Sequence, residues 1–105
     1  MSLYTIAQAS QEVELTPYTL RYYEKEGLLP NVTKDAAGRR KYRDTDLQMI
    51  GFIKCLKGTG MSLKQIKEYG DLYKQGKAKF NERNVMLESH REKILEEIKT
   101  QKKYL

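Results

Sequence analysis

Cysteine, histidine and long apolar runs are scarce or absent in this chain of 105 residues, and their scarcity excludes several classes of protein. The one cysteine, Cys55, cannot form an internal disulfide, and the one histidine, His90, stands far from it. A zinc site built on paired thiolates is therefore excluded. No apolar run approaches the roughly 20 residues of a membrane span, and the first residues lack a signal-peptide pattern. We expect a soluble, cytoplasmic protein without a metal, a cofactor or a membrane partner.

The usual combinations of catalytic residues are also absent. His90 has no acid, thiol or second histidine at a useful spacing, and no glycine-rich segment is suited to cradle a phosphate. Glu96 and Glu97 lie in a charged stretch that is typical of a solvated helix face. We therefore expect no enzymatic activity.

Positive charge is abundant by contrast. Lys and Arg number 20 against 14 Asp and Glu, which gives a net charge of +6 at pH 7. This balance is typical of a protein that meets a polyanion, and nucleic acid is the leading candidate. The length suits one small domain, and a hydrophobic fraction of 39% provides only a modest core, so we expect oligomerisation.

Two short helices are predicted near the N-terminus. The residues from Thr5 to Gln8 form a capping-box pattern, which starts the first helix. Thr16 and Pro17 repeat a helix-start signal, and the second helix runs from about Tyr18 to Glu26 and stops at Gly27. Two short helices across a tight connector predict a helix-turn-helix.

Residues 31–43 break the helical period and predict a small hairpin, or wing, with a strand from Arg39 to Arg43. The segment from Lys34 to Arg43 holds five basic residues against one acid, Asp35, which makes it the densest positive cluster of the chain. The alternative interpretation is a solvated loop without a partner.

Two more helices follow the wing. Asp44 is expected to cap a third helix that runs to Gly58 or Gly60. The residues from Ser62 to Gln65 form a second capping box, which starts a fourth helix that ends at Gly76. Four residues of the fourth helix fall at helical spacing and are interpreted as core, namely Leu63, Ile66, Tyr69 and Tyr73.

The last helix, from Lys77 onward, contains neither proline nor glycine. Its apolar residues alternate at spacings of three and four, which indicates the seam of a coiled coil. The seam is narrow and partly polar, so a two-helix coiled coil between subunits explains it better than packing on its own domain. The apolar seam residues are Phe80, Leu87, Ile94, Ile98 and Leu105, and the polar ones are Asn84, Arg91 and Gln101.

The second helix carries side chains suited to DNA. Tyr18, Arg21 and Tyr22 fall on adjoining positions, and Tyr23 and Lys25 extend this polar and aromatic surface. Arginine can bridge phosphates or read guanine, and tyrosine hydroxyls can donate to phosphate oxygens. A short helix must bury something alongside its one leucine, and we interpret Tyr22 as that core residue.

Three ordered motifs carry a resemblance to a known family. They resemble the signature of the MerR family of bacterial transcription regulators over roughly residues 4–76, and the helix that follows stands where that family has its dimerisation coiled coil. The motifs are Thr19 to Glu24 with Gly27 to Pro30, then Gly38, Arg40 and Tyr42 in the wing, and then Gly60 to Leu63 with Ile66.

The resemblance implies a mainly α architecture: a winged helix-turn-helix DNA-binding domain with a second helix pair over residues 1–76, and a dimerisation helix of an antiparallel coiled coil over residues 77–105. It implies a homodimer that binds an inverted repeat in double-stranded promoter DNA. The bound DNA is distorted so that RNA polymerase meets realigned promoter elements.

The resemblance also assigns roles to single residues. Tyr18 falls at a base-facing position, Arg21 and Tyr23 at groove and phosphate positions, Arg40 at the wing phosphate contact and Lys57 at a basic backbone contact. Thr16 and Arg39 complete the DNA-binding set. The family usually has tyrosine where this chain has Arg39, and the additional charge is expected to strengthen nonspecific binding.

Cys55 is the candidate sensing residue. It lies off the apolar stripe of the third helix, which Met49, Ile50, Ile53 and Leu56 form. Its surroundings resemble the NmlR-like or AdhR-like subgroup, which keeps a single cysteine here and responds to aldehydes or related electrophiles. Lys54 and Lys57 are nearby in sequence and could favour the thiolate form of Cys55, which would support sensing. The alternative is that Cys55 is a small, packed hydrophobic residue.

Other functions stay open at this point. The chain could be a ligand- or drug-responsive regulator of the same family that stops at Leu105 without its C-terminal effector domain. It could also be a small architectural DNA-binding protein without signal sensing, or an adaptor that uses only the coiled coil. The wing together with the second helix favours sequence-specific DNA binding over the adaptor.

Overall fold

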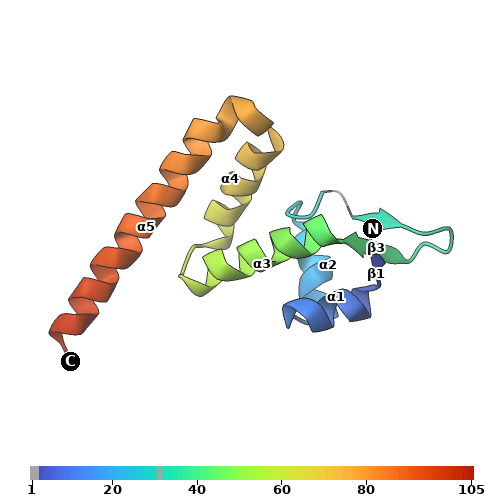
Figure 1. Ribbon diagram of the computed structural model, residues 1–105, viewed down its shortest axis with the longest axis horizontal. Coiled ribbons are helices and arrows are strands. Elements are labelled where there is room, and N and C mark those ends of the chain that lie inside the picture. The colour runs from blue at the N-terminus through green and yellow to red at the C-terminus, as the bar shows by residue number, and fades with distance from the viewer. Residues whose placement is uncertain (1–2, 31) are drawn as a thin grey trace. The chain divides into compact units, whose positions relative to one another are not determined.

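Three helices begin directly after the predicted capping residues Thr5, Thr16 and Ser62 in the computed structural model, which describes residues 3–30 and 32–105 (Figure 1). Contacts divide the chain into two compact units, Met1–Gly58 and Thr59–Leu105. None of the described helices is long and apolar enough to cross a membrane. The first unit contains β1 (Leu3–Tyr4), α1 (Ile6–Val13), α2 (Pro17–Lys25), β2 (Thr33–Lys34), β3 (Arg40–Arg43) and α3 (Asp44–Gly58).

The starts of α1 and α2 confirm the predicted caps. The Thr5 side chain accepts a hydrogen bond from the backbone N–H of Gln8, and the Gln8 side chain accepts one from the backbone N–H of Thr5. Thr16 caps α2, and Pro17 occupies the first turn, where its missing N–H costs nothing. Gly27 follows α2 with a φ of 80°, a backbone conformation that side chains other than glycine rarely adopt.

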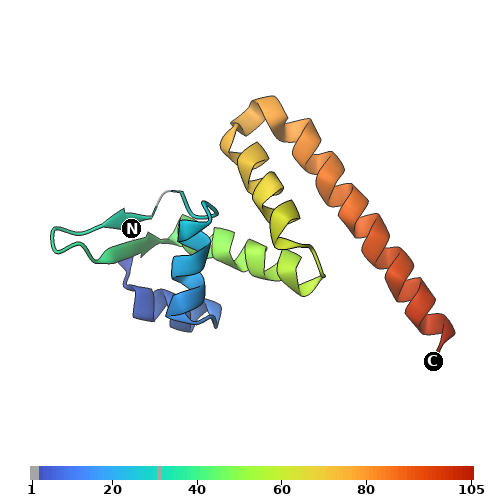
Figure 2. The ribbon, with the colours of Figure 1, turned by 180° about the vertical axis from the view of Figure 1, so that it is seen from behind.

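A three-stranded antiparallel sheet in the order β1-β3-β2 includes the wing. Strand β2 pairs with β3 as the predicted hairpin, with Lys34 opposite Arg40. The loop between the two strands projects away from the helices in both views (Figure 2). The sequence did not predict β1, which pairs Tyr4 with Tyr42.

The core of the first unit comes from all three helices, the wing strand and the segment after α2. Completely buried side chains include Leu20 of α2, Tyr42 of β3 and Ile50 of α3. Burial of an aliphatic or aromatic side chain of this size contributes about 1.5 to 3 kcal/mol, so these residues fix the wing and α2 on the same body. The remaining buried residues are Ala9, Tyr23, Leu28, Leu29, Ile53 and Leu56.

Helix α3 starts differently from the prediction. Asp44 is the first helical residue rather than a cap before the helix, and its carboxylate accepts a hydrogen bond from the Tyr4 hydroxyl at 2.9 Å. Asp46 is buried, and its carboxylate accepts a hydrogen bond from the backbone N–H of Arg43 at 2.9 Å. This bond satisfies one of the donors that the start of a helix leaves unpaired.

The second unit contains α4 (Leu63–Lys74), a short 3₁₀ helix η1 (Gly76–Lys79) and α5 (Phe80–Lys103). The capping box of α4 is confirmed, with Ser62 accepting from the backbone N–H of Gln65 at 3.2 Å. Helix α4 packs against α5, so this helix pair forms one unit that begins after Gly58. The division drawn from the sequence instead follows Gly76.

Two side chains of the second unit lie where the sequence did not predict them. Tyr73 was interpreted as core, but it is 49% exposed and its ring contacts the Arg83 guanidinium, 5.0 Å from the ring centre. His90 is half-buried and shares a hydrogen bond of 2.7 Å with the Thr59 hydroxyl, a contact that the sequence did not predict. Ile66 and Tyr69 are buried as predicted, and Leu63 is half-buried.

Candidate nucleic-acid interface

Helix α2 presents two predicted DNA-contacting side chains to solvent. Tyr18 is 73% exposed, and Arg21, one turn later, is also exposed. Within the described residues, Arg21 makes no hydrogen bond or ion pair, so its guanidinium donors are available. Thr16 at the start of the helix accepts the backbone N–H of Thr19 at 3.1 Å, so its oxygen already has a structural role.

The two adjacent tyrosines of α2 differ from their predicted environments. Tyr23 was assigned to the exposed groove-facing surface, but it is only 4% exposed, and that assignment of its side chain to the surface is wrong. Burial, followed by the neighbouring Tyr22, raises the pKa of the Tyr23 hydroxyl. Tyr22 was interpreted as core and is half-buried. Tyr22 stands one turn after Tyr18, whereas Tyr23 stands three residues after the buried Leu20.

An aspartate builds the tip of the wing. One carboxylate oxygen of Asp35 accepts the backbone N–H groups of Ala37 at 3.0 Å and of Arg39 at 2.9 Å. The other oxygen pairs with the Arg39 side chain at 3.2 Å. The backbone N–H of Arg39 is the main cause that lowers the pKa of Asp35. Arg39 itself remains 77% exposed, as a DNA-contacting side chain must be.

Arg40, the predicted wing phosphate contact, is held by an acid from another element. Its Nε donates to the Glu24 carboxylate on the last turn of α2. The Arg40 side chain is 31% exposed and that of Glu24 is 22% exposed. The pairing of Glu24 with Arg40 could not be predicted from the sequence, because the two residues lie 16 positions apart and no local spacing connects them.

Lys57 completes the predicted DNA-binding set. It lies exposed in the last turn of α3, and it has no ion pair within the part of the chain that the structure describes. Lys25 and Lys34 are further exposed cations of the first unit, and they too have no ion pair with a described residue. The first unit thus carries Thr16, Tyr18 and Arg21 on α2, Arg39 and Arg40 on the wing, and Lys57 on α3.

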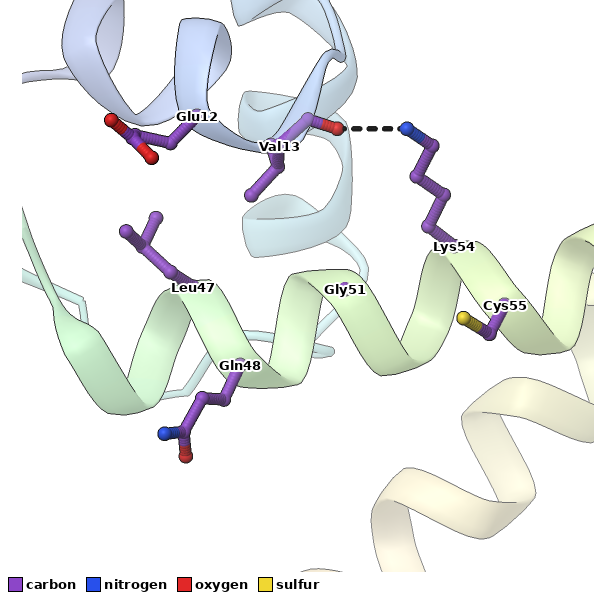
Figure 3. A pocket seen from close by; sticks show the side chains of 7 residues that line it. All are labelled: Glu12, Val13, Leu47, Gln48, Gly51, Lys54 and Cys55. Atoms are coloured by element: carbon purple, nitrogen blue, oxygen red, sulfur yellow. Dashed lines mark hydrogen bonds between the residues drawn. The ribbon is translucent and has the colours of Figure 1, made fainter.

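Cys55 is exposed on α3, at the edge of an open hollow of about 670 Å³ between α1 and α3 (Figure 3). Val13, Leu47 and Gly51 give the hollow an apolar lining, and a Cβ at Gly51 would meet no atom within 4 Å. Lys54 extends towards α1 and away from the Cys55 sulfur, and it donates to the Val13 carbonyl at 3.0 Å. The proposed assistance of Cys55 by Lys54 is therefore not seen in this arrangement.

The seam of α5 is only partly covered within the chain. Phe80 is 53% exposed, Ile98 is 45% exposed and Leu105 is fully exposed, whereas Leu87 and Ile94 are half-buried. Leu95, next to the seam, is 50% exposed. Large apolar side chains in a row on one helix mark a surface that a partner can cover.

Comparison with known proteins identifies the family. Residues 4–71 match the MerR HTH family regulatory protein family, and residues 47–103 match the MerR DNA-binding family. A helix-turn-helix transcriptional regulator from Haemophilus influenzae is 42% identical over 102 residues, which are 97% of this chain and 76% of the relative.

The chain belongs to the MerR family.

Solved structures of the MerR family agree with this assignment. HiNmlR, a family regulator that lacks the sensor domain and was crystallised on promoter DNA, is 41% identical with a TM-score of 0.88. The comparison covers 98% of this chain and 78% of HiNmlR. A MerR family regulator from Bacillus thuringiensis is 30% identical with a TM-score of 0.85, and the comparison covers 98% and 90% of the two chains. The winged helix-turn-helix prediction is thereby confirmed.

The regulator AdhR from Bacillus subtilis is 37% identical over 91 residues, which are 87% of this chain and 65% of AdhR. The regulator YyaN from the same organism is 51% identical over 69 residues, and the match spans half of its length. These relatives are transcriptional regulators, and this chain is a transcriptional regulator of the MerR family.

Proposed function

We propose that this chain binds an inverted repeat in promoter DNA as a homodimer, and distorts the duplex so that RNA polymerase meets realigned promoter elements. The observation that carries the proposal is the exposed Tyr18 and Arg21 surface on the second helix of the helix-turn-helix, on the same unit as the cationic wing. The 41% identical HiNmlR structure contains promoter DNA, which supports the same partner for this chain.

The contacts divide into reading and anchoring. Tyr18 has both an exposed ring and a hydroxyl at the base-facing position of α2, so it reads sequence. Arg21, Arg39, Arg40 and Lys57 are cations, so they anchor the protein on phosphates at any sequence. The two kinds of residue should therefore differ in what a substitution weakens: the preference for one sequence, or the affinity for any duplex.

Selection of duplexes from a random pool by the wild-type chain, followed by titration, tests this function. Enrichment of an inverted repeat is expected. Tyr18→Ala should reduce the preference for the selected duplex over a scrambled one by about tenfold, since one base contact contributes about 1 to 3 kcal/mol of discrimination. Arg40→Ala should weaken binding to both duplexes alike. Equal losses on both duplexes for both variants would contradict the division, and no enrichment would refute the function.

The α5 seam supports an antiparallel homodimer with a specific register. Antiparallel pairing of two copies about the midpoint between Glu92 and Lys93 places every seam residue opposite a seam residue of the second copy. Apolar residues then meet apolar residues, and polar residues meet polar ones, apart from one mixed layer that occurs twice around the centre. The layers are Phe80 with Leu105, Asn84 with Gln101, Leu87 with Ile98, and Arg91 with Ile94.

Oxidative cross-linking tests this dimer. In a Cys55→Ser background, Leu87→Cys combined with Ile98→Cys should give a disulfide-linked dimer, because the two Cα atoms must approach within about 7 Å. Ile94→Cys combined with Ile98→Cys is the matched control, since a shift of one heptad, about 10 Å, would be needed to pair these residues. Cross-linking of the control pair alone would show the shifted register, and a monomer with neither link would refute the dimer.

We further propose that Cys55 is the sensor of small electrophiles such as aldehydes. Its sulfur is exposed beside the apolar hollow between α1 and α3, which has room for a small adduct. The thiol adds to the carbonyl carbon, a C–S bond replaces the carbonyl π bond, and the thiol proton moves to the carbonyl oxygen. AdhR, at 37% identity, belongs to the subgroup that the sequence resembles.

The sensor is tested first by the alkylation rate of Cys55 in the DNA-bound protein, relative to an unfolded peptide cysteine with a pKa near 8.5. A faster rate is expected. In a promoter reporter, Cys55→Ser should preserve DNA binding and lose the response to aldehyde. A reporter that still responds to aldehyde in this variant would refute the sensing role.

A further inference from the structure

We infer that Glu24 is a positioning residue for DNA binding, which holds the wing residue Arg40 against helix α2 so that the outer end of its guanidinium faces a phosphate. The inference rests on the proposed DNA binding and adds a residue to it. Glu24 is an acid on the recognition helix, where simple electrostatics would make it unfavourable for a polyanionic partner.

The geometry fixes one side of the Arg40 guanidinium and leaves the other side available. Only Nε of Arg40 donates to Glu24, so four of its five N–H donors, on the two terminal nitrogens, have no partner within the described residues. A carboxylate on Nε sets the plane and direction of the guanidinium. The terminal nitrogens then form a fork that suits two phosphate oxygens.

The strand explains why Arg40 needs this support. Arg40 and Tyr42 leave β3 on the same face, because side chains alternate along a strand, and Tyr42 is completely buried. Arg40 therefore starts from the core side of the wing and must pass over α2 to reach solvent. Glu24 lies at the end of that path, on helix α2. The buried side chains of Leu20 and Tyr23 hold this helix against the core.

The Glu24 carboxylate also lies one turn from a second cation that is predicted to face DNA, Arg21. Glu24 follows Arg21 by three residues, so the two side chains occupy neighbouring positions on α2. Burial is the main cause that raises the pKa of the Tyr42 hydroxyl; the nearby Glu24 raises it further, whereas Arg40 and Arg21 lower it. The four side chains therefore lie near one another, where the wing meets α2.

Two variants of Glu24 separate positioning from net charge. Glu24→Gln and Glu24→Ala remove the same negative charge, but the glutamine amide oxygen can still accept from Nε. Positioning predicts that wild type binds the selected duplex most tightly, that Glu24→Gln binds about threefold more weakly, and that Glu24→Ala binds about tenfold more weakly, since a charge-assisted bond is about twice as strong as a neutral one. Glu12→Gln on α1, an exposed acid, is the control for the charge change.

The Arg40→Ala background shows whether Glu24 acts through Arg40. There neither Glu24→Gln nor Glu24→Ala should weaken DNA binding, because the removed carboxylate no longer has an arginine to hold. Between wild type and Glu24→Gln, thermal unfolding should change much less than DNA affinity. Tighter binding by both Glu24 variants, as for Glu12→Gln, would overturn the inference, and so would equal losses with and without Arg40. A wild-type chain that binds no duplex would refute the proposed function itself, which distinguishes the two failures.

Discussion

The salt dependence of DNA binding reports both the number of cations at the interface and the number of protomers. Four predicted phosphate-facing cations are Arg21, Arg39, Arg40 and Lys57, so a homodimer brings eight to the duplex. Each neutralised phosphate contributes about −0.9 to the slope of log K against log salt concentration, so we expect a slope of about −7 for the dimer and about −3.6 for a single protomer. Between 50 and 200 mM salt, the dimer should lose about 10⁴ in affinity and the protomer only about 10².

Arg21→Gln is the perturbation that tests this count. Arg21 makes no ion pair or hydrogen bond within residues 3–30 and 32–105, so its replacement removes a cation without leaving an acid unpaired. The slope of the dimer should become less steep by about 1.8, because one contact per protomer is lost. Fluorescence anisotropy of a labelled selected duplex at several salt concentrations measures this change.

Lys99→Gln on α5 serves as the control for this measurement. It makes the same charge change at an exposed position to which no DNA contact is assigned, and its slope should equal that of wild type within experimental error. A slope for Arg21→Gln that equals the wild-type slope would refute the placement of Arg21 at the phosphates. A wild-type slope near −3.6 would show that only one protomer contacts the duplex.

Three further outcomes follow from particular contacts. Tyr42→Phe should leave the unfolding free energy unchanged or higher, because the buried hydroxyl has no hydrogen-bond partner among the described residues; a loss above about 2 kcal/mol in chemical denaturation would contradict this. The lowered pKa of Asp35 means that its support of the wing turn is complete above its ordinary value of 3.8 and is lost as the pH falls through the lowered value; NMR exchange of the Ala37 and Arg39 amides should follow that titration, and Asp35→Asn should abolish it. Ser62→Ala should cost about 1 kcal/mol in unfolding free energy, and an unchanged value would show that the α4 cap is not formed.

The helices could be predicted because their signals are local. A capping residue and the residue with which it exchanges hydrogen bonds lie within one turn, as for Thr5 with Gln8 and Ser62 with Gln65. The exposure of Cys55 could be predicted in the same way, because helical periodicity alone separates it from the stripe that includes Ile50 and Ile53. The wing hairpin could also be predicted, because its turn residues reverse the chain between two strands that are close in sequence.

The remaining features depend on contacts between distant segments. Strand β1 has only two residues, and only its pairing with β3 makes it a strand. The environments of Tyr22 and Tyr23 depend on which side of α2 meets the core, and two adjacent tyrosines carry no pattern that decides it. Tyr73 could have been core by spacing, but Arg83 of α5 covers its ring instead.

The wing shows how distant contacts change a conclusion drawn from local charge. The sequence places five basic residues against one acid, Asp35, there, but the structure brings two further acids to them, from α2 and α3. Arg39 pairs with Asp35 in the wing turn, Arg40 with Glu24 of α2, and Arg43 with Asp46 of α3. The wing is therefore closer to neutral in space than in sequence.

This compensation favours precision over nonspecific attraction at the wing. A paired arginine attracts DNA less at long range, because the negative charge of the nearby carboxylate offsets its positive charge. It also loses less side-chain freedom when it meets a phosphate, because its direction is already fixed. Under the proposed function, the unpaired cations Arg21, Lys25 and Lys57 would supply the long-range attraction, whereas Arg39 and Arg40 would supply contacts that form only when the duplex fits the wing. A wing of this kind would strengthen binding to DNA of the correct shape more than binding to DNA in general, which agrees with the proposed distortion of the promoter.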